Sequence, residues 1–220
     1  MLNLLFPRVC AGCQQQLLKY EEVLCLQCIH ELPIASFHRN NSEILKDKFY
    51  GRFALENATA LIYFQKRGIT QALLHNLKYR GSREISAFFG KWLGAELAEN
   101  ISYSKIEMVI PVPLHKQKLK IRGYNQVEGF GKAIALALNI PYCDAILIKV
   151  SKTGSQVFKT RVLRFETEEV FTVQNLELIE NKHILLVDDI ITTGATLEKC
   201  AIQLLKGENV SFSIATIATS

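Results

Sequence analysis

The chain has 220 residues, of which 49% are hydrophobic and 21% are charged, as in an ordinary globular domain with room for a small additional module. The net charge of +5 suits anionic ligands and does not by itself indicate nucleic-acid binding. No apolar run approaches the roughly 20 residues that a membrane span needs, and no signal peptide is recognisable, so we expect a cytoplasmic protein without membrane insertion.

Two Cys-x-x-Cys pairs near the amino terminus are the first chemically informative feature. They are separated by eleven residues, and their members are Cys10, Cys13, Cys25 and Cys28. Four thiolates at this spacing are typical of a tetrahedral structural Zn²⁺ site that is closed to substrate. Disulfides, free thiols and a redox dithiol are the alternatives; a reducing compartment disfavours disulfides, and no βαβ pattern surrounds the pairs. We therefore predict a zinc module over residues 1–35, a linker over 36–57 and the main domain over 58–220.

The main domain alternates predicted strands and helices. Apolar residues at helical spacing predict helices over 69–79, 84–100 and 126–138. Short apolar runs predict strands over 58–64, 108–112, 145–150, 171–173, 184–187 and 210–217. This alternation indicates an α/β fold in which helices cover both faces of one doubly wound, mostly parallel sheet.

The strand predicted at 184–187 leads into two adjacent carboxylates, Asp188 and Asp189. Ligands of parallel sheets bind beyond the carboxyl ends of the strands, where this pair can accept hydrogen bonds from two vicinal ribose hydroxyls. The hydroxyl-rich loop 192–196 and the start of a helix predicted over 195–206 follow, and free N–H groups at a helix start attract phosphate. A plain core strand with a solvated turn is one alternative. A Walker B strand is another, but the chain has no phosphate loop to accompany it.

Two further stretches are rich in cations. Residues 115–122 carry four lysines or arginines and no acid, and they follow a predicted strand whose carboxyl end shares an edge with Asp188. A pyrophosphate needs such a positive, amide-rich surface, although a solvated basic loop is the alternative. Residues 149–164 carry five cations and no acid, which suits either a lid over a polyphosphate or a surface hairpin.

The sequence at 187–196 resembles the phosphoribosyl-pyrophosphate (PRPP) signature of type I phosphoribosyltransferases. This resemblance implies that Asp188 and Asp189 hold the ribose hydroxyls. It also implies a 5′-phosphate loop that consists of Thr192, Thr193, Gly194, Ala195 and Thr196.

The order of motifs along almost the whole chain is similar to that of the ComF family of bacterial competence-associated proteins, which includes a protein linked to gluconate transport. The four cysteines are followed by Leu-Lys-Tyr-Arg-Gly at 77–81, Pro-Val-Pro-Leu-His at 111–115, Arg-Gly-Tyr-Asn-Gln at 122–126, the stretch from Gln156 to Arg164 and the PRPP signature. The family pattern has a leucine near the place of Phe158, which is a mild departure.

The resemblance implies a phosphoribosyltransferase, a transferase of the glycosyltransferase class, that uses PRPP with Mg²⁺ in a role linked to DNA uptake and natural transformation. We assign leaving-group stabilisation to Arg122, Lys159 and Arg161 and to a pyrophosphate loop of Val112, Pro113, Leu114 and His115. The acceptor stays open. The competing hypothesis is a non-catalytic PRPP sensor that binds single-stranded DNA through its basic loops and aromatic residues. A subunit that docks a competence-machinery protein through the zinc module is compatible with both.

Overall fold

The computed structural model describes residues 7–40, 42–151 and 169–220. Its centre is a sheet of four parallel strands in the order β1-β6-β5-β2. The strands are β1 (Ala58–Tyr63), β2 (Met108–Pro111), β5 (His183–Ile191) and β6 (Ser211–Thr219). The four main strand predictions and the doubly wound α/β fold are thereby confirmed.

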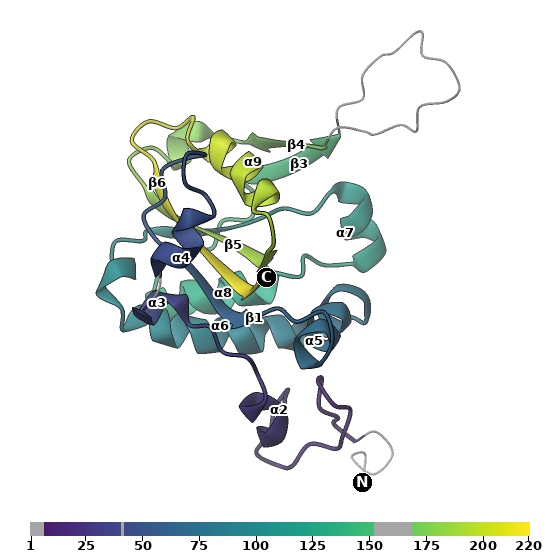
Figure 1. The fold of residues 1–220 in the computed structure, drawn as a ribbon. Coiled ribbons are helices and arrows are strands. Elements are labelled where there is room, and N and C mark those ends of the chain that lie inside the picture. The colour runs from purple at the N-terminus through teal and green to yellow at the C-terminus, as the bar shows by residue number, and fades with distance from the viewer. Residues whose placement is uncertain (1–6, 41, 152–168) are drawn as a thin grey trace.

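Both faces of the sheet are covered, which explains the unbroken aliphatic run in β5. Leu185 and Val187 point into a core built with α5 (Ile69–Tyr79), α6 (Arg83–Ala98) and α8 (Glu128–Leu138). Ile184 and Leu186 point into the opposite core, which includes α9 (Ala195–Leu204). Figure 1 shows α6 and α8 on one side of the sheet and α9 on the other.

Close packing of α6 on α8 depends on glycines. A Cβ at Gly90 would lie 2.5 Å from the carbonyl oxygen of Phe130, so no other residue allows this approach of the two helices. The 3₁₀ turn Ile101–Tyr103 then leads from α6 toward β2.

Two predicted strands are not part of the main sheet. Strand β3 (Leu147–Ser151) pairs antiparallel with β4 (Glu169–Val173) in a separate two-stranded sheet, so our placement of 145–150 and 171–173 in the parallel sheet was wrong. The outer edge of β2 is already engaged, because the Val109 amide donates to Pro141 and the Cys143 amide donates to Val109. The 3₁₀ turn Leu176–Leu178 connects β4 toward β5.

The amino-terminal module packs on α5. Its short helix α2 (Leu26–His30) begins after its N-cap residue Cys25 and contains Cys28. Asn76 of α5 donates a 2.9 Å hydrogen bond to the Ala11 carbonyl. A Cβ at Gly12 would lie 3.0 Å from Ile69, which shows how closely the module approaches the same helix.

The segment 36–57, which we predicted to be a linker, is packed against the main domain. It contains α3 (Phe37–Asn40) and α4 (Ser42–Asp47), and both contact β1. Phe37, Leu45 and Phe49 are buried in the same core as α9. No helix among the described residues is both long and apolar enough to cross a membrane.

Candidate functional site

The two aspartates lie in the carboxyl-terminal half of β5, which continues to Ile191, beyond the end at residue 187 that we predicted. Asp188 is 8% exposed and Asp189 is 4% exposed. The Asp188 carboxylate accepts a 2.8 Å hydrogen bond from the Asp189 amide, and Asp189 Oδ2 lies 2.5 Å from Nζ of Lys78. The site therefore has an acidic pair in which one carboxylate is matched by an ammonium from α5.

Burial gives this pair its electrostatic character. Removal from water raises the pKa of Asp188 well above its usual value, and the neighbouring charge of Asp189 raises it further. The Asp189 amide and Lys78 act in the opposite direction. Two carboxylates in so little solvent favour hydrogen-bond donors or cations that arrive with a ligand.

The predicted phosphate loop lies directly beyond this pair. Thr192, Thr193 and Thr196 are exposed, and Gly194 is buried with a φ of +77°. The Ala195 amide, at the first residue of α9, lies 3.4 Å from the Thr193 hydroxyl. A left-handed glycine before a ten-residue helix presents hydroxyls and helix-start N–H groups on one surface, which suits a phosphate.

The predicted pyrophosphate loop is held beside the same strand. The buried Val112 donates its amide to the Val187 carbonyl at 2.9 Å and accepts from the Asn125 side chain at 3.0 Å. Pro113, Leu114 and His115 follow and are half-buried. The pyrophosphate loop and the acidic pair thus lie at the same edge of the sheet, because the loop is bonded to Val187 and Val187 immediately precedes Asp188.

The basic stretch after this loop is a helix, not the loop that we expected. His115 caps α7 (Lys116–Arg122) by accepting the Gln117 amide at 3.3 Å, and Gly123 ends it with a φ of +78°. None of its residues is buried.

Arg122 is connected to the end of α5. It donates to the Gln126 side chain, and its guanidinium lies 5.6 Å from the centre of the Tyr79 ring. Nearby, Tyr124 donates its hydroxyl to the Leu77 carbonyl, and Arg83 lies 4.5 Å above the Tyr124 ring. The motifs at 77–81 and 122–126, which are far apart in sequence, therefore meet in space.

Lys78 is the site residue that sequence reasoning missed. It lies inside the motif at 77–81, which we used only to recognise a family, and its contact with Asp189 depends on how α5 packs. Lys159 and Arg161, our two lid cations, and most of the stretch 149–164 lie outside the described residues.

A cavity of about 440 Å³ adjoins the pyrophosphate loop. It lies between that loop, α7, the start of α8 and β3. Its side chains are of mixed character and include Pro113, Leu119, Tyr124, Tyr142 and Asp144.

The four module cysteines converge as a metal site requires. All four sulphur atoms lie within 4.8 Å of one another, and three of the cysteines are buried. The amides of Gly12 and Cys25 approach the Cys10 sulphur at 3.4 and 3.3 Å, and the Cys28 amide approaches the Cys25 sulphur at 3.4 Å. Such N–H···S contacts stabilise thiolates, so the donor set is compatible with structural zinc.

Comparison with known proteins identifies relatives of the whole chain and of its carboxyl-terminal half. The phosphoribosyl transferase domain family model matches residues 128–220. Competence protein ComFC of Bacillus subtilis (strain 168) is 27% identical over 215 residues, which is 97% of this chain and 85% of the relative. DNA utilization protein YhgH of Escherichia coli O157:H7 is 27% identical over 139 residues, which is 61% of this chain and 60% of the relative.

Among solved structures, adenine phosphoribosyl transferase from Trypanosoma brucei is 17% identical with a TM-score of 0.39, and the match covers 64% of this chain and 66% of that one. This structural likeness is too weak to assign the fold, which is assigned from the strand order and from the match to the phosphoribosyl transferase domain model. Together these show a type I phosphoribosyltransferase-like domain joined to a small four-cysteine module.

Proposed function

The chain is a homologue of the ComF competence proteins over nearly its whole length, and on that premise we propose that it is a cytoplasmic phosphoribosyltransferase linked to DNA uptake. It would bind PRPP with Mg²⁺ and transfer the phosphoribosyl group to an acceptor. The observation that carries the proposal is the buried pair Asp188–Asp189 between the hydroxyl-rich loop and the Val112 loop. We also propose that residues 1–35 bind one structural zinc ion, with 36–57 joining them to the domain 58–220.

In this proposal the acidic pair orients the ribose. Two vicinal hydroxyls donate to the carboxylates of Asp188 and Asp189, which fixes the face of the sugar that an acceptor can reach. The exposed hydroxyls of Thr192, Thr193 and Thr196 donate to the 5′-phosphate, whose negative charge is stabilised at the start of α9. Ribose and phosphate are then held at two points, so C1′ has a fixed position.

The leaving group is pyrophosphate. As the C1′–O bond breaks, its electron pair leaves with the pyrophosphate and positive charge develops on the ribose ring; the acceptor then forms the new bond to C1′. The backbone of residues 112–115 and the guanidinium of Arg122 would stabilise the departing charge, with Lys159 and Arg161 as the lid cations. Mg²⁺, when bound with PRPP, supplies further charge neutralisation.

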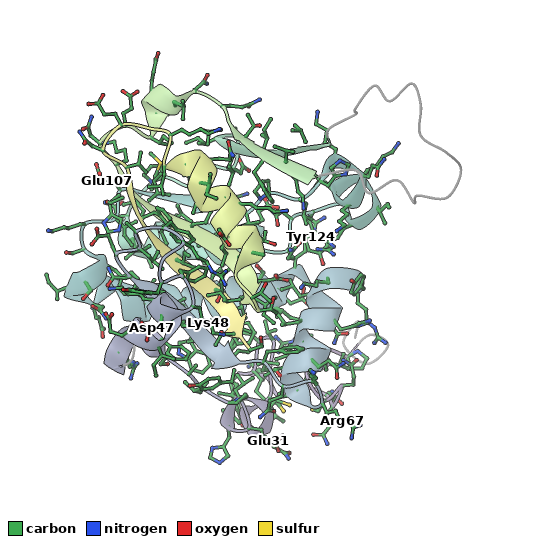
Figure 2. The ribbon with its side chains drawn as sticks, turned by 45° about the horizontal axis from the view of Figure 1, so that its top comes forward. Glu31, Asp47, Lys48, Arg67, Glu107 and Tyr124 are labelled. Atoms are coloured by element: carbon green, nitrogen blue, oxygen red, sulfur yellow. The ribbon has the colours of Figure 1, made fainter. Side chains whose placement is uncertain are left out.

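Isothermal calorimetry of PRPP with Mg²⁺ tests the proposal. Wild type should bind, and the Asp188→Asn, Asp189→Asn double variant should lose most of the affinity because amides cannot replace two charged acceptors. Glu107→Gln is the matched control. This carboxylate, labelled in Figure 2, accepts a 3.1 Å hydrogen bond from the amide of His183, the first residue of β5, whereas the acidic pair lies toward the other end of that strand. Equal binding by wild type and the double variant would disprove the site assignment. Pyrophosphate release on addition of candidate acceptors then tests turnover.

One observation favours a second function, the binding of single-stranded DNA. Helix α7 carries Lys116, Lys118, Lys120 and Arg122, with no acidic residue, and all of it is accessible. Exposed Tyr79 beside Arg122 adds an aromatic face on which a base can stack. Neutralising the three lysines together should weaken binding of an oligonucleotide and flatten its salt dependence. An unchanged salt slope in that variant would eliminate α7 as the binding surface.

A further inference from the structure

The segment from Lys48 to Arg52, which precedes β1, packs against the proposed phosphate loop. The Phe49 ring lies so close to Gly194 that an added Cβ would be 2.5 Å from the ring. Nη1 of Arg52 donates a 2.9 Å hydrogen bond to the Thr193 carbonyl. Lys48 donates to the Thr219 hydroxyl at 3.2 Å and to the Ser220 carbonyl, at the end of the adjacent strand. Residues of the amino-terminal half of the chain therefore pack against one side of the loop.

Two charged side chains, Arg52 and Glu198, lie beside the loop 192–196. Residues 192–196 contain no cation, so the loop offers a phosphate only neutral donors. The first turn of α9 carries Glu198, a carboxylate that would repel an incoming phosphate. Nη1 of Arg52 lies 3.3 Å from Glu198 Oε2 as well as contacting Thr193, so a guanidinium both offsets that carboxylate and adjoins the loop.

We propose that Arg52 is a specificity-determining residue for the 5′-phosphate. Its two contacts fix the guanidinium beside the loop through Nη1, and its remaining N–H groups donate to a phosphate oxygen once the ligand is bound. A planar guanidinium with five donors suits this double task, whereas a lysine ammonium offers a single point of charge. The proposal rests on the proposed function, since it takes the loop 192–196 to be the phosphate site.

The test separates the two ends of PRPP. Ribose 5-phosphate probes the phosphate loop alone, and pyrophosphate with Mg²⁺ probes the other end; both dissociation constants are measured by calorimetry. Arg52→Met should weaken ribose 5-phosphate about tenfold or more, as expected when one charge-assisted hydrogen bond is lost. Pyrophosphate affinity should stay unchanged. Arg52→Lys should recover part of the loss.

Glu198 provides an independent check on the electrostatic part. Glu198→Gln should tighten ribose 5-phosphate, and the Arg52→Met, Glu198→Gln double variant should bind better than Arg52→Met alone. The matched control is Arg39→Met, which removes an exposed arginine of α3 that is paired with Glu96 of α6 and not with the loop. That variant should bind both probes as wild type does.

Three outcomes would overturn the proposal. Unchanged ribose 5-phosphate affinity in Arg52→Met would show that its charge does not reach the ligand. Equal losses for both probes would show a general loosening of the site and not a phosphate contact. If wild type binds neither probe, the proposed function fails as well, which distinguishes that result from the other two.

Discussion

Replacement of Lys78 by methionine tests how much the ammonium of this residue stabilises the buried acidic pair. The ammonium lies 2.5 Å from Asp189 Oδ2, and the Lys78 side chain is 26% exposed against 6% for that of Asp189. Methionine has nearly the same length and removes only the charge and the donors. The variant therefore leaves a buried carboxylate without its cation.

The expected cost follows from distance and burial. At an effective dielectric constant of about 20, two unit charges at this separation attract by about 7 kcal/mol. Desolvation and partial solvent access offset most of that: exposed ion pairs contribute about 0–1 kcal/mol, and removal of one partner of a buried pair costs about 3–5 kcal/mol. Because this pair is partly buried, we expect Lys78→Met to lower the free energy of unfolding by about 2 kcal/mol at neutral pH.

The loss should depend on pH with a definite sign. The folded-state pKa of Asp188 is raised, chiefly by burial, so its ionisation costs stability that is absent in acid and grows as pH rises toward that pKa. Lys78 reduces this cost, and the difference between variant and wild type should shrink as pH falls.

Urea unfolding at several pH values measures this difference, with Lys132→Met as the matched control. Lys132 lies 2.6 Å from Glu128, but on the exposed surface of α8, with side chains 56% and 39% accessible. Such a pair is worth about 0.3–0.5 kcal/mol. The reasoning is refuted if Lys78→Met loses no more than Lys132→Met, or loses as much at low pH as at pH 7.

Two further perturbations have clear expected outcomes. Gly194→Ala should lower the free energy of unfolding in urea by about 2–5 kcal/mol, because a side chain at φ +77° is strained and its Cβ contacts Phe49. The control Gly51→Ala, at φ +73° with no atom within 4 Å, should cost about 1–2 kcal/mol from backbone strain alone. Equal costs would show that the Phe49 contact is unimportant. Strong chelation should release one zinc ion per chain and deprotect the amides of residues 7–35 first in hydrogen exchange, and protein purified under reducing conditions without bound zinc would contradict the zinc assignment.

The parts of the fold that could be predicted were those whose residues form a local pattern. β5 is recognisable because Ile184 to Val187 must face two cores, and a parallel strand covered on both faces needs an unbroken aliphatic run. The carboxylates and the loop that follow are contiguous with it, so placing the strand also places the proposed phosphate loop. The cysteine pairs were also predictable, because Cys-x-x-Cys spacing by itself brings two sulphur atoms to the same side of a turn.

What sequence reasoning missed depends on partners far away in the chain. The β3–β4 hairpin has strand-like sequences, but nothing local indicates that residues 141–143 engage the edge of β2 and leave the hairpin to pair with itself. The sequence around Lys78 is that of an ordinary helical lysine, and its contact with Asp189 exists only because α5 packs against the sheet. Arg52 lies in a polar segment that we took for a linker.

The site is therefore assembled from more of the chain than the family match suggests. The match to residues 128–220 includes the acidic pair and the proposed phosphate loop, but the central sheet also needs β1 and β2, which precede it. Lys78 and Arg52 come from the same preceding half. The cysteine module is attached to α5 by the hydrogen bond from the Asn76 side chain to the Ala11 carbonyl, and Asn76 lies two residues before Lys78. Because one helix contacts both the cysteine module and the acidic pair, removal of the proposed zinc ion should loosen Lys78 as well as the module, and a structural metal would then influence ligand affinity.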